Sequence, residues 1–366
     1  MRFSYFILPV LLLISLFSIS CDSDYRPMSI GAADEVIVIM DSTLWESDTA
    51  LALEDTFGKM IETIPGYEPT YRLMYRDFST NSQLDELRRN KNIIVVSPID
   101  DDTNVAALIR AILSDEVEER VRNGDSFAFP LRDRWVRDQW TLLLTSTSDE
   151  ELAEKIINSE RSLVGNLLEL EFERRIGEVF RRGEQVAISD SLWQKHGWSV
   201  RMQHDYVQSV ETDDVVVFRR YLPDNNRWML GWWKDDVDNI DFLDHEWINA
   251  QRDSLLEQYL RGERDNSYIT TEYRRAVITD EVVRDDRIIG FETLGTWTMT
   301  NDFMGGPFVN FTYYDPETQR LFMIEYGQFA PSVNKRRFVR QFRAMGRTFQ
   351  ADSTWNSVDE MITDLN

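Results

Sequence analysis

The pattern of apolar residues changes near residue 186, and this change constrains the fold of the 366-residue chain most strongly. Before it, short apolar runs such as 36–40 and 92–96 alternate with helical patterns, which is typical of an α/β layer. After it, strand patterns dominate and aromatic residues concentrate in them. The sequence therefore predicts the fold class α+β: an N-terminal α/β sandwich-like region followed by a mainly antiparallel, aromatic-rich sheet with packing helices.

The N-terminal region is expected to span residues 34–185 and to end in a long helix over 149–181, with Gly165 as its weak point. An earlier helix is predicted over 44–61, with Ser42 or Thr43 as its N-cap. Shorter helices are expected at 82–89 and from Asp102 or Thr103 onward. The predicted strands, which form a partly antiparallel sheet, are 36–40, 71–75, 92–96, 127–131 and 140–144.

The C-terminal region is expected to span residues 186–350, and residues 351–366 are predicted to be a tail. Its two predicted helices are 243–260, ended by Gly262 as a C-cap, and 332–347. Its predicted strands are 198–210, 214–221, 227–233, 268–278, 287–299, 308–314 and 321–328.

Cys21, the only cysteine, stands where an apolar leader ends and a polar, acidic sequence begins. The apolar stretch is shorter than the roughly 20 residues that span a bilayer, and small residues precede the cysteine. Residues 1–20 therefore indicate a lipoprotein signal peptide; a retained membrane helix or a buried free cysteine fits less well. We expect lipid on Cys21, a tether at 21–33, and anchoring in the cell envelope, with the outer membrane or the periplasmic face and the leaflet left open.

The formal net charge of −24 limits the partners of the chain. Such a surface argues against binding to nucleic acid and against electrostatic adhesion to anionic lipid headgroups. The expected partners are the membrane, through the lipid on Cys21, and an envelope protein or a glycan.

A block rich in glycine, Asn301-Asp302-Phe303-Met304-Gly305-Gly306-Pro307, follows a predicted strand. Glycine permits close backbone approaches, so a tight, buried crossover between strands is the favoured interpretation. The functional alternative is a ligand loop formed by Asn301, Asp302, Met304, Gly305 and Gly306. In that reading, Asp302 would lie near Glu272 and Glu292, and paired carboxylates could do acid–base work.

No metal or cofactor is expected from the sequence. His196, His204 and His245 lack ligand-like spacing, and the acidic run 235–241 lacks the glycine and distal glutamate of an EF-hand. No nucleophile elbow, phosphate-binding loop or dinucleotide fingerprint is present.

Two side-chain groups in the C-terminal region are predicted to be structural. Alternation places Trp228 and Trp232 on one face of a strand and Trp233 on the other, as expected for core aromatics, although sugar stacking stays open. Arginines recur along the last helix, and in a chain with 64 acidic residues we expect them to pair with the protein's own carboxylates.

Most of the chain after Cys21 resembles a Bacteroidota lipoprotein family known as a domain of unknown function, DUF4837. The block at 301–308 carries the resemblance most specifically. The remaining matching segments are 35–41 with Trp45, 253–256, 267–272, 290–293 with Trp297, 330–331, 335–336 and 340–341. The resemblance implies an envelope lipoprotein and supplies no catalytic residue.

The sequence thus favours a lipid-anchored envelope protein with a non-enzymatic binding or assembly role in its second half. The alternative is a carboxylate-dependent hydrolase of envelope glycan or peptide that uses Glu272, Glu292 or Asp302.

Overall fold

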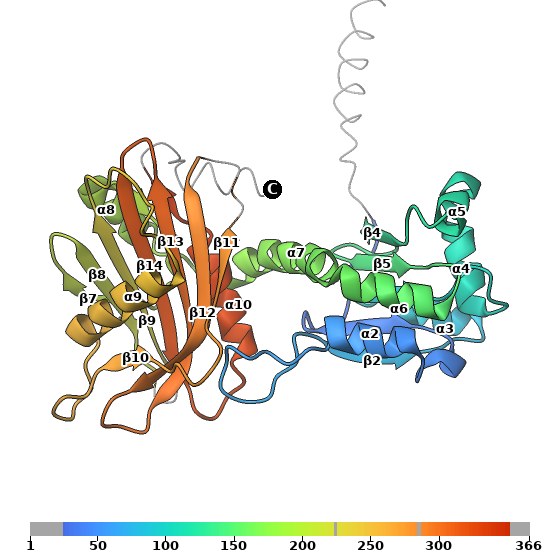
Figure 1. Ribbon diagram of the computed structural model, residues 1–366, viewed down its shortest axis with the longest axis horizontal. Helices are drawn as coiled ribbons and strands as arrows, with labels where there is room; N and C mark the ends of the chain where they lie inside the picture. Colours follow the sequence, from blue (N-terminus) through green and yellow to red (C-terminus); the bar gives the residue numbers. More distant parts are fainter. Residues whose placement is uncertain (1–24, 223–224, 283, 285–286, 352–366) are drawn as a thin grey trace, which may run out of the picture. The chain divides into compact units, whose positions relative to one another are not determined.

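The computed structural model describes residues 25–222, 225–282, 284 and 287–351 (Figure 1). The chain folds into two compact units, and both are discontinuous in sequence. The first unit comprises the chain up to Trp45 and Met74–Ser148, and the second comprises Glu46–Leu73 and the chain from Asp149 onward. The predicted signal peptide, Cys21 and all of the predicted tail except Ala351 lie outside the described residues. Within the described residues, no helix is long and apolar enough to cross a membrane.

The first unit is built on a five-stranded sheet with the order β2-β1-β3-β5-β4. β1, β3 and β5 are parallel, whereas β4 is antiparallel to β5, so the expectation of partly antiparallel pairing is confirmed. The buried runs of β1 and β3 contribute Ile39 and Val95 to the core, against Ile109 of α4. The elements are β1 Glu35–Ile39, the 3-10 turn η1 Ser42–Leu44, β2 Arg72–Arg76, α3 Asn81–Leu87, β3 Asn92–Val96, α4 Asn104–Ile112, α5 Asp115–Arg122, β4 Ala128–Arg132 and β5 Trp140–Leu144.

The second unit is built on an antiparallel sheet with the order β10-β12-β13-β14-β9-β8-β7, in which β11 also pairs with β12. The strands are β6 Trp198–Ser199, β7 Val207–Glu211, β8 Val215–Arg220, β9 Asn226–Lys234, β10 Ile269–Thr271, β11 Ile278–Val282, β12 Ile289–Met299, β13 Gly305–Asp315, β14 Arg320–Phe329 and β15 Gln350–Ala351. The helices are α2 Asp48–Thr56, α6 Asp149–Asn158, α7 Glu160–Phe180, α8 Val186–His196, α9 His245–Tyr259 and α10 Arg336–Gly346.

Helices cover both faces of this sheet (Figure 1). Because side chains alternate along a strand, Trp228 and Trp232 pack in the core under α9, whereas Trp233 packs in the core that includes α8 and α10. The predicted division of the three tryptophans is therefore confirmed. The fold class α+β, with an aromatic-rich antiparallel sheet, is confirmed as well.

Several predicted boundaries are wrong for local reasons. The first helix starts at Asp48, because the hydroxyl of Ser47 accepts a hydrogen bond from the backbone N–H of Ala50 and caps it. The long helix is interrupted at Ser159, whose φ of −112° and ψ of 13° are not helical, while Gly165 lies inside α7. Helix α9 is capped at Leu260 and not ended by Gly262.

The predicted strands at 198–210 and 268–278 are also shorter in the structure. The first is reduced to β6 and β7, and the second to β10 followed by β11. Between β10 and β11 the backbone turns, since the N–H of Arg275 bonds to the carbonyl oxygen of Glu272.

The arginines of α10 pair with carboxylates of the same unit, as predicted. Arg340 lies 2.8 Å from Glu171, and Arg343 lies 2.6 Å from Glu292. The start of this helix is held by Glu68, whose carboxylate accepts hydrogen bonds from the backbone N–H groups of Lys335 and Arg336 at 2.6 and 3.2 Å.

Candidate ligand-binding site

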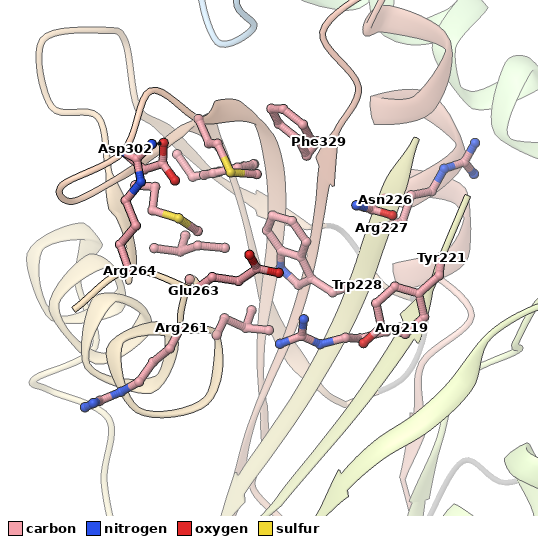
Figure 2. A pocket seen from close by; sticks show the side chains of 16 residues that line it. Arg219, Tyr221, Asn226, Arg227, Trp228, Arg261, Glu263, Arg264, Asp302 and Phe329 are labelled. Carbon is pink, nitrogen blue, oxygen red and sulfur yellow. Dashed lines mark ion pairs between the residues drawn. The ribbon is translucent and has the colours of Figure 1, made fainter. Parts of the chain in front are cut away.

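A pocket of about 450 Å³ lies in the second unit, where β8, β9, β10, β12 and β14 meet the segment after α9 and the loop between β12 and β13. Figure 2 shows the side chains that line it. Its apolar wall consists of Trp228, Leu260, Ile269, Trp297, Met299, Met304 and Phe329. Its polar lining includes Arg219, Tyr221, Asn226, Arg261, Glu263, Arg264 and Asp302. A volume of this size suits a small molecule or one residue of a larger ligand.

Two indoles form the centre of the apolar wall. The rings of Trp228 and Trp297 meet edge to face with centroids 5.1 Å apart. The strand ladder makes room for them, because Trp228 lies opposite Gly327, where a Cβ would overlap the indole. The indole N–H of Trp297 donates to the carbonyl oxygen of Gln328 at 3.2 Å. The indole N–H of Trp228 is buried and has no hydrogen-bond partner among the described residues.

Some charged groups of the lining are already engaged. Arg264 and Asp302 form an ion pair at 3.6 Å. Arg227 turns away from the pocket in Figure 2, and its guanidinium lies over the ring of Phe338 and donates to Gln341 at 3.3 Å. Burial lowers the pKa of the Arg227 guanidinium to about 10. These charged groups have partners within the protein, so they support the structure of the site.

Three other charges of the lining are not neutralised. Arg219 and Glu263 form no ion pair and no side-chain hydrogen bond among the described residues, and both point toward Trp228 in Figure 2. Arg261 donates from Nε to the carbonyl oxygen of Glu257 at 2.9 Å and has no carboxylate partner among the described residues. These three side chains are available to a ligand.

The predicted ligand loop is only partly at this pocket. Asp302 and Met304 line it, whereas Asn301, Gly305 and Gly306 do not. Asn301 has a positive φ of 55°, and Gly305 and Gly306 begin β13. A Cβ on Gly306 would overlap the backbone oxygen of Gln328, so this glycine serves the close approach of neighbouring strands.

The three candidate catalytic carboxylates are held in separate ion pairs. Glu272 bonds to Arg274 at 2.6 Å, and this hydrogen bond lowers the pKa of Glu272 to about 2. Glu292 is buried against Arg343. Of the three, Asp302 alone lines the pocket. The geometry therefore does not bring the predicted carboxylates together there.

The histidines lie apart from the pocket lining. His196 lies 3.3 Å from Glu211, His204 lies 3.8 Å from Asp205, and His245 begins α9. Within the described parts of the chain, no group of three or more histidine, cysteine, aspartate or glutamate side chains is arranged to hold a metal ion.

Arg219, Arg261, Glu263 and Trp297 were not recognised as site residues from the sequence, because the pocket is assembled from distant segments. One local signal was available. The predicted strands 214–221 and 227–233 are neighbours in sequence, and in the β8–β9 pairing Arg219 lies opposite Trp228. Directly opposed residues share a face of the sheet, so this pair could have been inferred.

Residues 185–348, which contain the whole pocket, match the family model described as Domain of unknown function (DUF4837). This region of the chain is therefore similar to the DUF4837 family. This confirms the resemblance for the segments between 185 and 348, including the block at 301–308, whereas the segment 35–41 with Trp45 lies outside the match. Residues 29–180, before the DUF4837 domain, match a second model, Domain of unknown function (DUF8532).

None of the curated proteins matches the chain. Among solved structures, the chain is similar to the Saccharomyces cerevisiae Ran-binding protein Mog1p, with a TM-score of 0.30, 9% identity, and coverage of 44% of this chain and 94% of Mog1p. A mutant of protein Mog1 gives a TM-score of 0.28, 9% identity, and coverage of 42% and 90%.

Proposed function

We propose that the DUF4837 domain is a non-enzymatic binding module that holds a small ligand, or one residue of an envelope macromolecule, in the pocket at Trp228. One observation carries the proposal: an indole-lined cavity of about 450 Å³ with Arg219 and Glu263 unpaired at its edge. Apolar walls with a few convergent polar groups are the usual composition of ligand sites. Arg340 and Arg343 of the same unit are, by contrast, already paired with the carboxylates of Glu171 and Glu292.

The hydrolase alternative receives no specific support from the geometry. A glycosidase needs one carboxyl that stays protonated near neutral pH, together with a second carboxylate across the substrate. Glu272 is instead stabilised as the anion by Arg274, and Glu292 is buried in a two-bond contact with Arg343. Neither side chain lines the pocket.

The cell-envelope location is part of the proposal, supported by the leader and the position of Cys21. We predict that Cys21→Ser releases the full-length protein from the membrane fraction and abolishes metabolic labelling with a fatty acid, because the thiol is the attachment atom. The matched control is Ser20→Ala, whose hydroxyl carries no lipid and which should remain membrane-bound. Labelling that persists in Cys21→Ser would contradict the anchor.

Binding is tested by identifying molecules that co-purify with the full-length protein from its own envelope. Met304→Trp places a larger side chain in the pocket, and Met60→Trp makes the same change at a half-exposed site outside the pocket lining. We expect mass spectrometry of organic extracts to show a ligand with the unmodified protein and with Met60→Trp. It should be depleted at least about tenfold with Met304→Trp, since overpacking excludes it.

Two results would contradict the binding role. Equal recovery of every extracted molecule from Met304→Trp and Met60→Trp would show that the pocket is not their site. Cleavage of an envelope glycan or peptide by the purified protein, lost in Asp302→Asn, would favour the hydrolase instead.

A further inference from the structure

The charge of the pocket differs in sign from that of the whole chain. Arg227 turns away from the pocket in Figure 2; of the other lining charges without an ionic partner in the described residues, Arg219 and Arg261 are positive and Glu263 is negative, which leaves a net charge of +1. The chain as a whole carries −24. A local positive site on an acidic protein is a place where an anion can be held while the rest of the surface repels it.

Arg219 is fixed with respect to the indole wall by the sheet. It lies on β8 directly opposite Trp228 of β9, so both side chains project from the same face. The guanidinium is thus placed beside an apolar surface, at the edge of the cavity. A ligand whose apolar body rests on Trp228 and Trp297 can therefore present its charged end to Arg219.

We propose that the ligand is an amphipathic anion: an aromatic or branched apolar body packs on the two indoles, and a carboxylate, sulfonate or phosphodiester group, each with one negative charge, pairs with Arg219. This inference rests on the proposed binding function and specifies its ligand class. Arginine presents a planar set of donors that fits such oxyanions in two-bond geometry.

Glu263 sets a limit on the charge of this ligand. Its carboxylate is exposed and unpaired on the segment after α9, and it points toward the same part of the pocket as Arg219 in Figure 2. A second negative charge on the ligand would approach Glu263 and be repelled. The site therefore favours a single negative charge, with room for a positive group beside Glu263.

The test uses two fluorescent probes with a closely related aromatic body, anilinonaphthalene sulfonate, which is anionic, and phenylnaphthylamine, which is neutral. Their affinities are measured for the full-length protein and for Arg219→Gln, Met304→Trp and the control Arg161→Gln, whose side chain is 89% exposed. We expect Arg219→Gln to weaken the sulfonate about tenfold and the neutral probe less than about twofold. Added salt should weaken sulfonate binding to the unmodified protein but have little effect in Arg219→Gln.

The outcomes separate the ligand class from the binding function. If Met304→Trp abolishes binding of both probes but Arg219→Gln changes neither, the pocket binds and the anion proposal is overturned. If Arg219→Gln weakens the binding of both probes equally, Arg219 shapes the pocket without pairing with the negative charge of the ligand. This result also overturns the anion proposal. If Met304→Trp changes neither affinity, the probes bind elsewhere and both proposals are contradicted.

Discussion

Arg252 and Glu325 form a charged pair inside the second unit, with side chains 0% and 1% exposed. Arg252 donates from Nε to Glu325 at 2.9 Å and from Nη1 to Thr271 at 2.7 Å, and Asn310 donates to the other carboxylate oxygen at 3.1 Å. Burial raises the pKa of Glu325, while Arg252 opposes that change. The two charges depend on each other, because Glu325 alone would be buried without a compensating charge and Arg252 would keep only the part-exposed Asp253, at 3.3 Å.

We predict that Glu325→Gln lowers the free energy of unfolding by about 3 kcal/mol, since it leaves the Arg252 guanidinium buried and under-compensated. Urea unfolding followed by circular dichroism measures the change. Arg161→Gln removes a partner from an exposed pair with Asp280 and should leave the midpoint unchanged. A Glu325→Gln midpoint equal to that of the unmodified protein would show that the buried pair is not needed for stability.

The buried Glu292 predicts a pH dependence. Burial alone would raise its pKa, but the charge and hydrogen bonds of Arg343, with Arg347 nearby, outweigh burial and lower the pKa below 4.5. A depressed pKa in the folded state stabilises the protein above the unfolded-state pKa, and this stability is lost as pH falls through the folded-state pKa.

Glu292→Gln should therefore cost about 3 kcal/mol near neutral pH and progressively less as pH falls below 4.5. Denaturant titrations of the unmodified protein and Glu292→Gln over an acid series provide the difference directly. The other carboxylates titrate in both proteins, so their contributions cancel in the difference between the two free energies of unfolding. A difference that stays constant with pH would mean that the ionised form of Glu292 contributes no stability.

At the scale of elements, the sequence predicts well those helices and strands that are determined by their own residues. The apolar runs of β1 and β3 identify strands because parallel strands are buried on both faces. Helix α8 was missed, although Lys195 and His196 in its last turn and the left-handed Gly197 after it, with φ 67°, form a recognisable C-terminal signal. The pocket could not be predicted from local sequence patterns, because its wall requires the pairing of strands that are distant in sequence.

The start of β13 allows a matched test of two adjacent glycines. Gly306 is buried where a Cβ would overlap the backbone oxygen of Gln328, whereas a Cβ on exposed Gly305 would lie 3.0 Å from the oxygen of Trp297. We predict that Gly306→Ala lowers the free energy of unfolding by about 3 kcal/mol and that Gly305→Ala costs no more than about 1 kcal/mol. Thermal and urea unfolding compare the two variants. Equal losses would contradict the assignment of Gly306 to close strand packing.

At the scale of the whole molecule, each unit has a core of its own. Leu143 is buried in the core of the first unit and Ile324 in that of the second, each with 0% exposure. We predict that Leu143→Ala and Ile324→Ala each cost about 3 kcal/mol but raise native-state hydrogen exchange only in their own unit. Mass spectrometry of exchanged peptides measures this. Faster exchange in both units from a single substitution would show that the units unfold together.

The hold of Glu68 on the start of α10 has a consequence for the order of synthesis. Residues 335 and 336 leave the ribosome long after residue 68, separated by 267 and 268 positions in the chain. At ordinary elongation rates this delay is on the order of tens of seconds. Helix α2 in the segment 46–73 can pack earlier, since the hydroxyl of Ser47 donates to Asp149 of α6 at 2.8 Å, but Glu68 must wait for its partners in α10. A nascent chain that stops before α10 should therefore leave the stretch around Glu68 more open to proteases than it is in the finished protein.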